Sequence, residues 1–152
     1  MLSENLPKAE DCNCFAVARH VSQFYDQFLA PTGLRTTQFS ILAKLNRKGP
    51  LTINELAKDM VMDRTTLGRN VRPLERDGLI AIEAAQSDRR AKKLRLTNAG
   101  EKRLRAAIKA WSRARFEMTF GARRAAELRG LMRAVVTTEL PAMAEASNGQ
   151  HR

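Results

Sequence analysis

Residues 51–80 read LTINELAKDMVMDRTTLGRNVRPLERDGLI and predict two short helices joined by a tight turn. The first helix begins with a capping box, in which Thr52 and Glu55 each satisfy a free backbone donor of the other. Asp63 can cap the second helix, and Gly78 can end it in the left-handed conformation that glycine adopts without strain. Two capped helices joined so closely are typical of a helix-turn-helix.

The second of these helices carries an apolar stripe on one side and a basic face on the other. Leu67, Val71 and Leu74 recur at steps of three and four residues and predict the buried side. Pro73 predicts a bend before the last turn, because proline lacks the N–H and crowds the preceding turn. The basic face predicts contact with the major groove of DNA, since arginine can fork onto guanine and glycine lets the backbone approach; a solvated face without a partner is the alternative. This face consists of Arg64, Thr65, Thr66, Gly68, Arg69, Arg72 and Arg76.

A two-stranded β-hairpin is predicted after the two short helices. The runs 79–82 and 93–96 have the apolar content and the alternation of strands, and a polar segment separates them. Thr36 or Thr37 is the expected start of the helix that precedes the helix-turn-helix. Longer helices are predicted on both sides of this central part, over residues 12–29, 37–47, from Thr97 onward, and from about 122 to 140. The expected apolar stripe of the first is Cys14, Val17, Val21, Phe24 and Phe28.

The tip of the hairpin carries cations at the reach of a neighbouring minor groove. Arg90 is the residue predicted to enter it, because the negative potential of a narrow minor groove attracts arginine. Asp88 can aim that side chain by pairing with it. Arg89 and Lys92 belong to the same candidate surface, and Lys92 is expected near phosphates, where it adds affinity without sequence information. An exposed turn without a partner is the alternative.

The charge of the chain favours a polyanionic partner. There are 27 Lys and Arg against 16 Asp and Glu, a net charge of +11. Residues 46–105 hold 15 Lys and Arg and 8 Asp and Glu, so most of the excess lies in the central part. Every Phe, Tyr and Trp lies outside that range. Because single-stranded nucleic acids are usually held by stacking on aromatic rings, this composition favours double-stranded DNA.

Length and composition limit the other classes of protein. With 152 residues and 43% hydrophobic side chains, the chain suits one soluble domain over residues 1–152. No apolar run approaches the ~20 residues that span a bilayer, and the first residues do not resemble a signal peptide, so a cytoplasmic protein without a membrane partner is expected. The small number of cysteines, Cys12 and Cys14, agrees with a reducing compartment.

An enzyme is not expected. The chain has only His20 and His151, and it has no metal-ligand cluster, glycine-rich phosphate loop or nucleophile–base set, so no catalytic residue, metal or cofactor is predicted. A thiol oxidoreductase built on Cys12 and Cys14 is the enzymatic alternative. A sequence-neutral DNA-binding protein is the other alternative, since it would use the same cations without choosing a sequence.

Three segments of the chain together resemble the winged helix-turn-helix of the MarR family of bacterial transcription regulators. They are LTINELA at 51–57, ERDGLI at 75–80 and SDRRAKKLRLTNAGEKRL at 87–104. The family's Asp-x-Arg wing signature falls on Asp88 and Arg90. The resemblance implies a mostly α fold of the α+β class with a small β-hairpin wing.

The same resemblance implies how the parts of the chain divide their work. Residues 46–96 would form the winged helix-turn-helix that binds DNA, and residues 11–45 and 97–145 would form a helical dimerisation part. A homodimer would then place its two reading helices in successive major grooves of a pseudo-palindromic operator, and the habit of the family favours repression. Independently, the apolar stripes of the first and last helices exceed what the central part can cover, which favours dimerisation; a bundle within one chain is the alternative.

Two kinds of signal fit the resemblance, oxidation and a small aromatic ligand. Cys14 and the residue after it resemble the Cys-Phe of the organic hydroperoxide regulators in the family, whose cysteine is the oxidised sensor. Thr36 and Phe39 stand where those regulators have two tyrosines that bond the sulfur. Cys12 is a second redox candidate, and an inert packed thiol is the alternative for Cys14. Members of the family commonly bind aromatic acids between the helical part and the winged part, and the candidates here, with ordinary core packing as the alternative, are Arg19, His20, Tyr25, Phe39 and Trp111.

Overall fold

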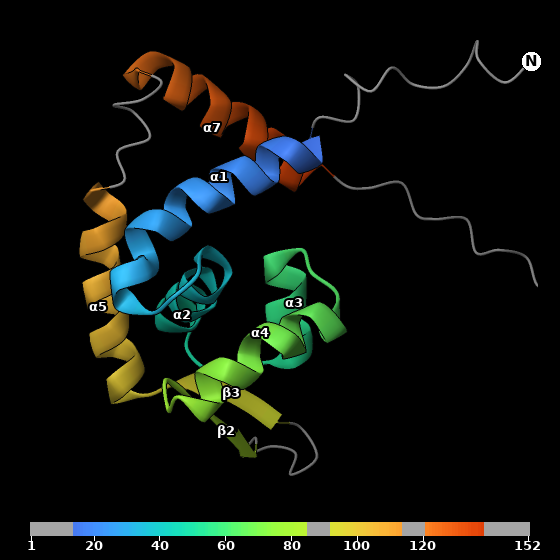
Figure 1. Ribbon diagram of the computed structural model, residues 1–152. Coiled ribbons are helices and arrows are strands. Elements are labelled where there is room, and N and C mark those ends of the chain that lie inside the picture. Colours follow the sequence, from blue (N-terminus) through green and yellow to red (C-terminus); the bar gives the residue numbers. More distant parts are fainter. Residues whose placement is uncertain (1–13, 85–91, 114–120, 139–152) are drawn as a thin grey trace, which may run out of the picture. The chain divides into compact units, whose positions relative to one another are not determined.

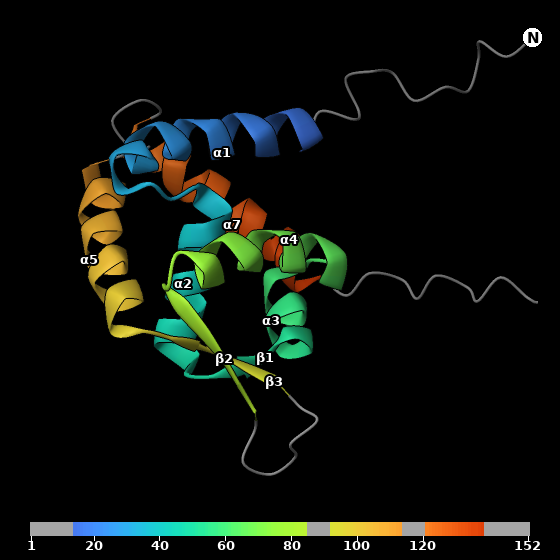
Figure 2. The same ribbon diagram turned by 60° about the horizontal axis from the view of Figure 1, so that its bottom comes forward.

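The computed structural model describes residues 14–84, 92–113 and 121–138. By their contacts the residues form two compact units, Met1–Arg115 and Phe116–Arg152. In the first unit α2 lies between α5 on one side and the α3–α4 pair on the other, and the strands lie at one end (Figure 1 and Figure 2). The elements of this unit are α1 (Cys14–Leu29), η2 (Ala30–Thr32), α2 (Thr36–Lys48), β1 (Leu51–Thr52), α3 (Ile53–Met60), α4 (Arg64–Arg76), β2 (Ile80–Ala84), β3 (Lys92–Leu96) and α5 (Asn98–Arg113).

The two short helices have the predicted caps. The backbone N–H of Glu55 donates to the Thr52 hydroxyl over 3.2 Å, and the Glu55 carboxylate accepts from the Thr52 N–H over 2.7 Å. The Asp63 carboxylate accepts from the backbone N–H of Thr66 over 2.8 Å and so caps α4. Gly78 follows α4 with a φ of +69°. The helix-turn-helix prediction is therefore confirmed to within a residue at each of these ends.

Acid should weaken the α4 cap at Asp63. The side chain and the backbone N–H of Thr66 donate hydrogen bonds to its carboxylate and lower its pKa from the ordinary value. A carboxylate with a lowered pKa stabilises the folded state above the unfolded pKa of about 3.9, and this contribution is lost as the pH falls through the lower folded pKa. The asparagine of an Asp63→Asn variant caps equally well without a charge. Thermal melts from pH 7 to pH 3 should therefore fall less steeply for Asp63→Asn than for the wild type, and equal slopes would contradict this role.

The sheet has three strands, so the prediction of a two-stranded hairpin was incomplete. The antiparallel order is β1-β3-β2, with Ile82 opposite Leu94 on one side of β3 and Leu51 opposite Leu94 on the other. β1 is only two residues long, too short for any alternation to be visible in the sequence. Its pairing with β3 attaches the hairpin to the start of α3.

The core forms where the predicted apolar stripe of α4 meets α2. Leu67, Val71 and Leu74 are buried, which confirms that stripe. α4 continues through Pro73 to its end, and the bend expected there stays a prediction. The buried residues that pack with the stripe include Ile41, Leu42, Leu45, Leu56, Leu94 and Leu104. Burial of this stripe leaves the opposite, basic side of α4 to solvent.

α5 is joined to the beginning of the hairpin by Thr97. Its hydroxyl donates to the carbonyl of Gly78 over 2.7 Å, and its backbone N–H donates to the carbonyl of Leu79 over 3.1 Å. The same hydroxyl accepts from the N–H of Gly100 over 3.0 Å and so caps α5, which the sequence predicts to run from Thr97 onward. Gly100 is buried against Leu79 at this junction.

The start of α2 is anchored to α1 rather than capped by its own threonine. Arg35 precedes the helix and Thr36 is its first residue. The carboxylate of Asp26 accepts from the backbone N–H of Thr36 over 2.6 Å and from its hydroxyl over 2.7 Å. A carboxylate at a helix N-terminus satisfies a free backbone donor, and its negative charge interacts favourably with the positive end of the helix dipole. The prediction that the helix starts at Thr36 or Thr37 is therefore confirmed, but the capping carboxylate comes from another helix.

Within one chain, the first turns of α1 leave the predicted apolar stripe exposed. Cys14 and Val17 are exposed, whereas Val21, Phe24 and Phe28 are half-buried and Leu29 is buried. This exposure is what the sequence predicts for a stripe that exceeds what the central part of the same chain can cover, and Phe15 beside it is also 72% exposed. An amphipathic pattern shows which residues share a side but not how far the neighbouring helices extend along it.

The second unit contains α7, from Ala122 to Thr137. The helix ends short of the predicted residue 140, and residues 139–152 lie outside the described part of the chain. Leu131 is 67% exposed and Val135 is 73% exposed within the chain. No helix in the described ranges is long and apolar enough to cross a membrane.

Candidate nucleic-acid interface

The predicted reading face of α4 is exposed. Arg64, Arg69 and Arg72 lie on the solvent side of the helix, opposite the buried stripe, and Thr65 and Thr66 are exposed as well. Gly68, in the middle of this face, has no heavy atom within 4 Å of the place where a Cβ would stand. The backbone is therefore open to a partner at that position.

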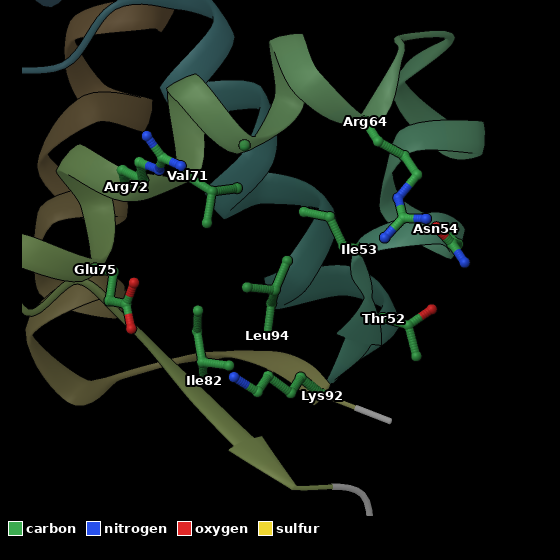
Figure 3. Close-up of a pocket in the computed structure, with 11 residues that line it drawn as sticks. Thr52, Ile53, Asn54, Arg64, Val71, Arg72, Glu75, Ile82, Lys92 and Leu94 are labelled. Carbon is green, nitrogen blue, oxygen red and sulfur yellow. The ribbon is translucent and has the colours of Figure 1, made fainter. Parts of the chain in front are cut away.

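A groove of about 510 Å³ runs between α4, the start of α3 and the hairpin (Figure 3). Arg72 and Glu75 project from α4 at one end of the view, and Arg64 lies near Asn54 of α3 at the other. Lys92 projects from β3 on the hairpin side of the groove, opposite α4. The remaining lining residues are Thr52, Ile53, Gly68, Val71, Ile82 and Leu94. The groove thus has an apolar floor and a charged rim, and both the helix-turn-helix and the hairpin contribute to that rim.

The cations of this surface are free to bind a partner. Within the ranges that the structure describes, Arg64, Arg72 and Lys92 make no ion pair, and neither does Arg69. Arg76 differs, because its Nε lies 3.0 Å from the carboxylate of Asp77 at the end of α4. Arg76 belonged to the predicted basic face, but its charge is partly satisfied within the helix.

Ion pairs hold the elements around the groove in position. Lys48 of α2 contacts the carboxylate of Asp59 in α3 over 2.5 Å, and this contact lowers the pKa of Asp59. On the hairpin, Arg95 donates to Glu83 over 2.7 Å, which lowers the pKa of Glu83 and raises that of Arg95. These charges act within the fold, so they are not available to a ligand in the way that Arg64 and Arg72 are.

Several predicted residues lie outside the part of the chain that the structure describes. Asp88, Arg89 and Arg90 at the hairpin tip lie outside the described residues, and so does Cys12. Lys92 is described, exposed and at the rim of the groove. The contact of the hairpin tip with a minor groove therefore stays a prediction.

Sequence reasoning missed Asn54 and Glu75. Asn54 is the second residue of the capping-box helix, a position whose free backbone donors commonly face a phosphate in helix-turn-helix proteins. That spacing could have identified it. Glu75 gave no such signal, because an acidic residue near the end of a helix is ordinary, and only the fold shows that it lines the groove.

Three of the five predicted ligand-pocket residues come together in one aromatic cluster. The ring of Trp111 in α5 stacks on Tyr25 of α1 with centroids 3.8 Å apart and on Phe39 of α2 at 4.7 Å. Arg19 and His20 are exposed on α1, and neither takes part in these stacks. The three rings are half-buried and cover one another's faces, so ordinary packing and a ligand pocket both stay open as predictions. Cys14 at the start of α1 is exposed.

Comparison with known proteins gives one family and several solved structures. The family model that matches is the MarR family, over residues 34–92. The transcriptional regulator MosR of M. tuberculosis, solved in complex with DNA, is 35% identical, with 82% of this chain and 94% of that one covered and a TM-score of 0.66. A probable transcriptional regulator from Pseudomonas aeruginosa is 28% identical over 82% and 98% of the two chains, with a TM-score of 0.70. Reduced AbfR bound to DNA is 26% identical over 81% and 87%, with a TM-score of 0.67.

Proposed function

Because this chain belongs to the MarR family of transcription regulators, we propose that it is a homodimeric repressor of a pseudo-palindromic DNA operator. The observation that carries the proposal is the free, exposed set of arginines on α4, opposite its buried stripe. Arginine presents a rigid fork of donors to guanine, and an arginine already held by a carboxylate would lose that capacity. This surface has both the charge and the freedom that a duplex requires.

Each part of the surface has a role in this proposal. Arg64, Thr65 and Arg69 contact base edges, because the first turns of a reading helix enter the major groove most deeply. Thr66, whose backbone is engaged with the Asp63 cap, supports that first turn. Arg72 and Lys92 bind phosphates along the groove. Arg90 enters the minor groove from the hairpin tip, Asp88 aims it by pairing with it, and Arg89 belongs to the same surface, as the sequence predicts.

Exposed apolar side chains support the homodimer. In the first unit Phe15 is 72% exposed, Val17 45% and Ile108 49%, and in the second unit Leu131 and Val135 are exposed by two thirds or more. Large apolar side chains gathered on terminal helices are typical of surfaces that a partner covers. Residues 11–45 and 97–145 are accordingly the proposed dimerisation part, and 46–96 the DNA-binding part. Light scattering on the purified protein should give twice the mass of one chain.

Selection of bound sites from a random duplex pool tests the proposal directly. A shared pseudo-palindrome whose half-sites lie one helical turn apart, ~34–36 Å, is expected for a symmetric dimer. Affinity for the selected site should also fall steeply with salt, by ~0.9 in the logarithmic slope for each phosphate neutralised. Equal affinity for random DNA would instead indicate a sequence-neutral DNA-binding protein, and peroxide turnover without DNA would indicate the thiol oxidoreductase.

Oxidation of Cys14 is the proposed signal for release. Its thiol is exposed on α1, so an oxidant can reach it. A small aromatic acid is the other candidate effector, and its predicted contacts include Tyr25, Phe39 and Trp111, whose rings stack on one another. Hydroperoxide should lower operator affinity in the wild type and not in a Cys14→Ser variant. Loss of affinity with an aromatic acid alone would assign the signal to the ligand.

Alanine at Gly68 should separate stability from DNA binding. Glycine inside a helix is less stable than alanine by ~0.5–1 kcal/mol, and the site has open space for a methyl group, so Gly68→Ala should stabilise the fold by about that amount. The same methyl would stand in the groove where the backbone approaches the bases, and operator affinity should fall by about 10-fold, the scale of one lost base contact. Denaturant unfolding and fluorescence anisotropy measure the two effects. Unchanged affinity would contradict the close approach.

A further inference from the structure

The carboxylates of the winged unit, residues 51–96, differ in whether other groups of the fold engage them, and this difference bears on DNA binding. Five of the six described between residues 51 and 96 are engaged: two cap helices and three pair with a cation. Glu75 is the remaining one. Within the described residues it accepts no hydrogen bond and forms no ion pair, and it is exposed. The engaged carboxylates are Glu55, Asp59, Asp63, Asp77 and Glu83.

The unpaired carboxylate lies inside the basic groove rather than on a remote surface. Glu75 lines the groove from α4, Arg72 stands one turn earlier on the same helix, and Lys92 lines the opposite wall from β3 (Figure 3). Glu75 is eleven residues after Arg64, or ~16 Å along the helix axis at 1.5 Å per residue. It therefore lies at the far end of the reading helix, where a duplex presents its backbone more than its bases.

We propose that Glu75 is a specificity-determining residue, whose charge repels the DNA backbone and so penalises binding to non-operator duplexes. The inference rests on the proposed function and names a new element of the same site. A non-specific complex is held almost wholly by phosphates, so the duplex settles against the free cations of the groove, where Glu75 stands among them. An operator complex is held also by base contacts near Arg64 and Arg69, which fix the position of the duplex. Bringing the Glu75 carboxylate close to phosphates therefore costs more free energy in the non-specific complex than in the operator complex. Proteins often discriminate against wrong partners by such repulsion.

The test compares Glu75→Gln with Glu101→Gln on two duplexes of equal length. Both substitutions remove one negative charge and keep the side-chain shape, but Glu101 lies on α5, outside this groove, where it pairs with Arg105 at 3.7 Å. Affinities for the selected operator and for a random duplex are measured by fluorescence anisotropy at physiological salt. Thermal melts verify that both variants fold as the wild type does.

Glu75→Gln is expected to bind the random duplex ~5- to 10-fold more tightly and the operator by less than about 2-fold, so its operator preference falls. Glu101→Gln should keep the wild-type preference, since a change in net charge alone acts on both duplexes alike. An unchanged preference in Glu75→Gln, or a loss of operator affinity without a gain on random DNA, would overturn the role of Glu75. A wild-type protein that binds neither duplex would contradict the proposed function itself.

Discussion

Alanine at position 100 is expected to destabilise the protein strongly, although the change adds only one methyl group. A Cβ on Gly100 would stand 2.1 Å from the carbonyl oxygen of Leu79 and 2.7 Å from a methyl carbon of Leu96. The carbonyl cannot move aside easily, because it accepts the backbone N–H of Thr97 over 3.1 Å. Overpacking a core costs ~1–3 kcal/mol and occasionally more, and a backbone neighbour places Gly100→Ala at the upper end.

Thermal unfolding of Gly100→Ala measures this effect. At about 3 kcal/mol the midpoint should fall by ~10 °C for a chain of this length. Gly68→Ala is the matched control, since it makes the same chemical change inside a helix where nothing lies within 4 Å. Gly68→Ala should melt slightly above the wild type; if Gly100→Ala also melts no lower than the wild type, α5 and the hairpin do not meet as closely as the structure shows.

Removal of the Arg69 side chain is expected to weaken operator binding strongly without altering the fold. Arg69 is exposed on α4 and forms no ion pair within the described residues, so its guanidinium does not support the folded chain. A bidentate contact with a base contributes ~1–3 kcal/mol of discrimination, which corresponds to a loss of about 5- to 150-fold for each half-site. The preference for the base pair it reads should relax at the same time.

Arg76→Ala is the control for Arg69→Ala. Arg76 is the same residue type on the same helix, but its side chain lies against Asp77 at 3.0 Å. Its removal should change operator affinity by a few-fold at most, through net charge. Equal losses in the two variants would mean that α4 contributes only its overall charge, and the assignment of Arg69 to a base would then be wrong.

The local features of the DNA-binding part were predictable because they depend on residues a few positions apart. The Thr52–Glu55 capping box, the Asp63 cap and the stripe of Leu67 and Val71 each lie within one or a few helical turns, and the structure confirms them. Hydrogen bonds at a helix end and the side that a helix buries are decided by such short spacings. The exposure of the arginines on α4 followed from the same stripe.

The remaining features required distant segments to be brought together. Three contacts join residues that are far apart in the sequence, and no periodic pattern of residues predicts them. They are the cap that Asp26 provides for α2, the pairing of β1 with β3, and the contact of Gly100 with Leu79. The same holds for Glu75, which the sequence shows as an ordinary helical acid and the fold places, unpaired within the described residues, in the basic groove. Short-range spacing in the sequence thus specified the helices and their buried sides. The packing of one element on another decided which charges are paired and which remain free for DNA. The reason is that a charge is paired only by groups that the whole fold brings beside it.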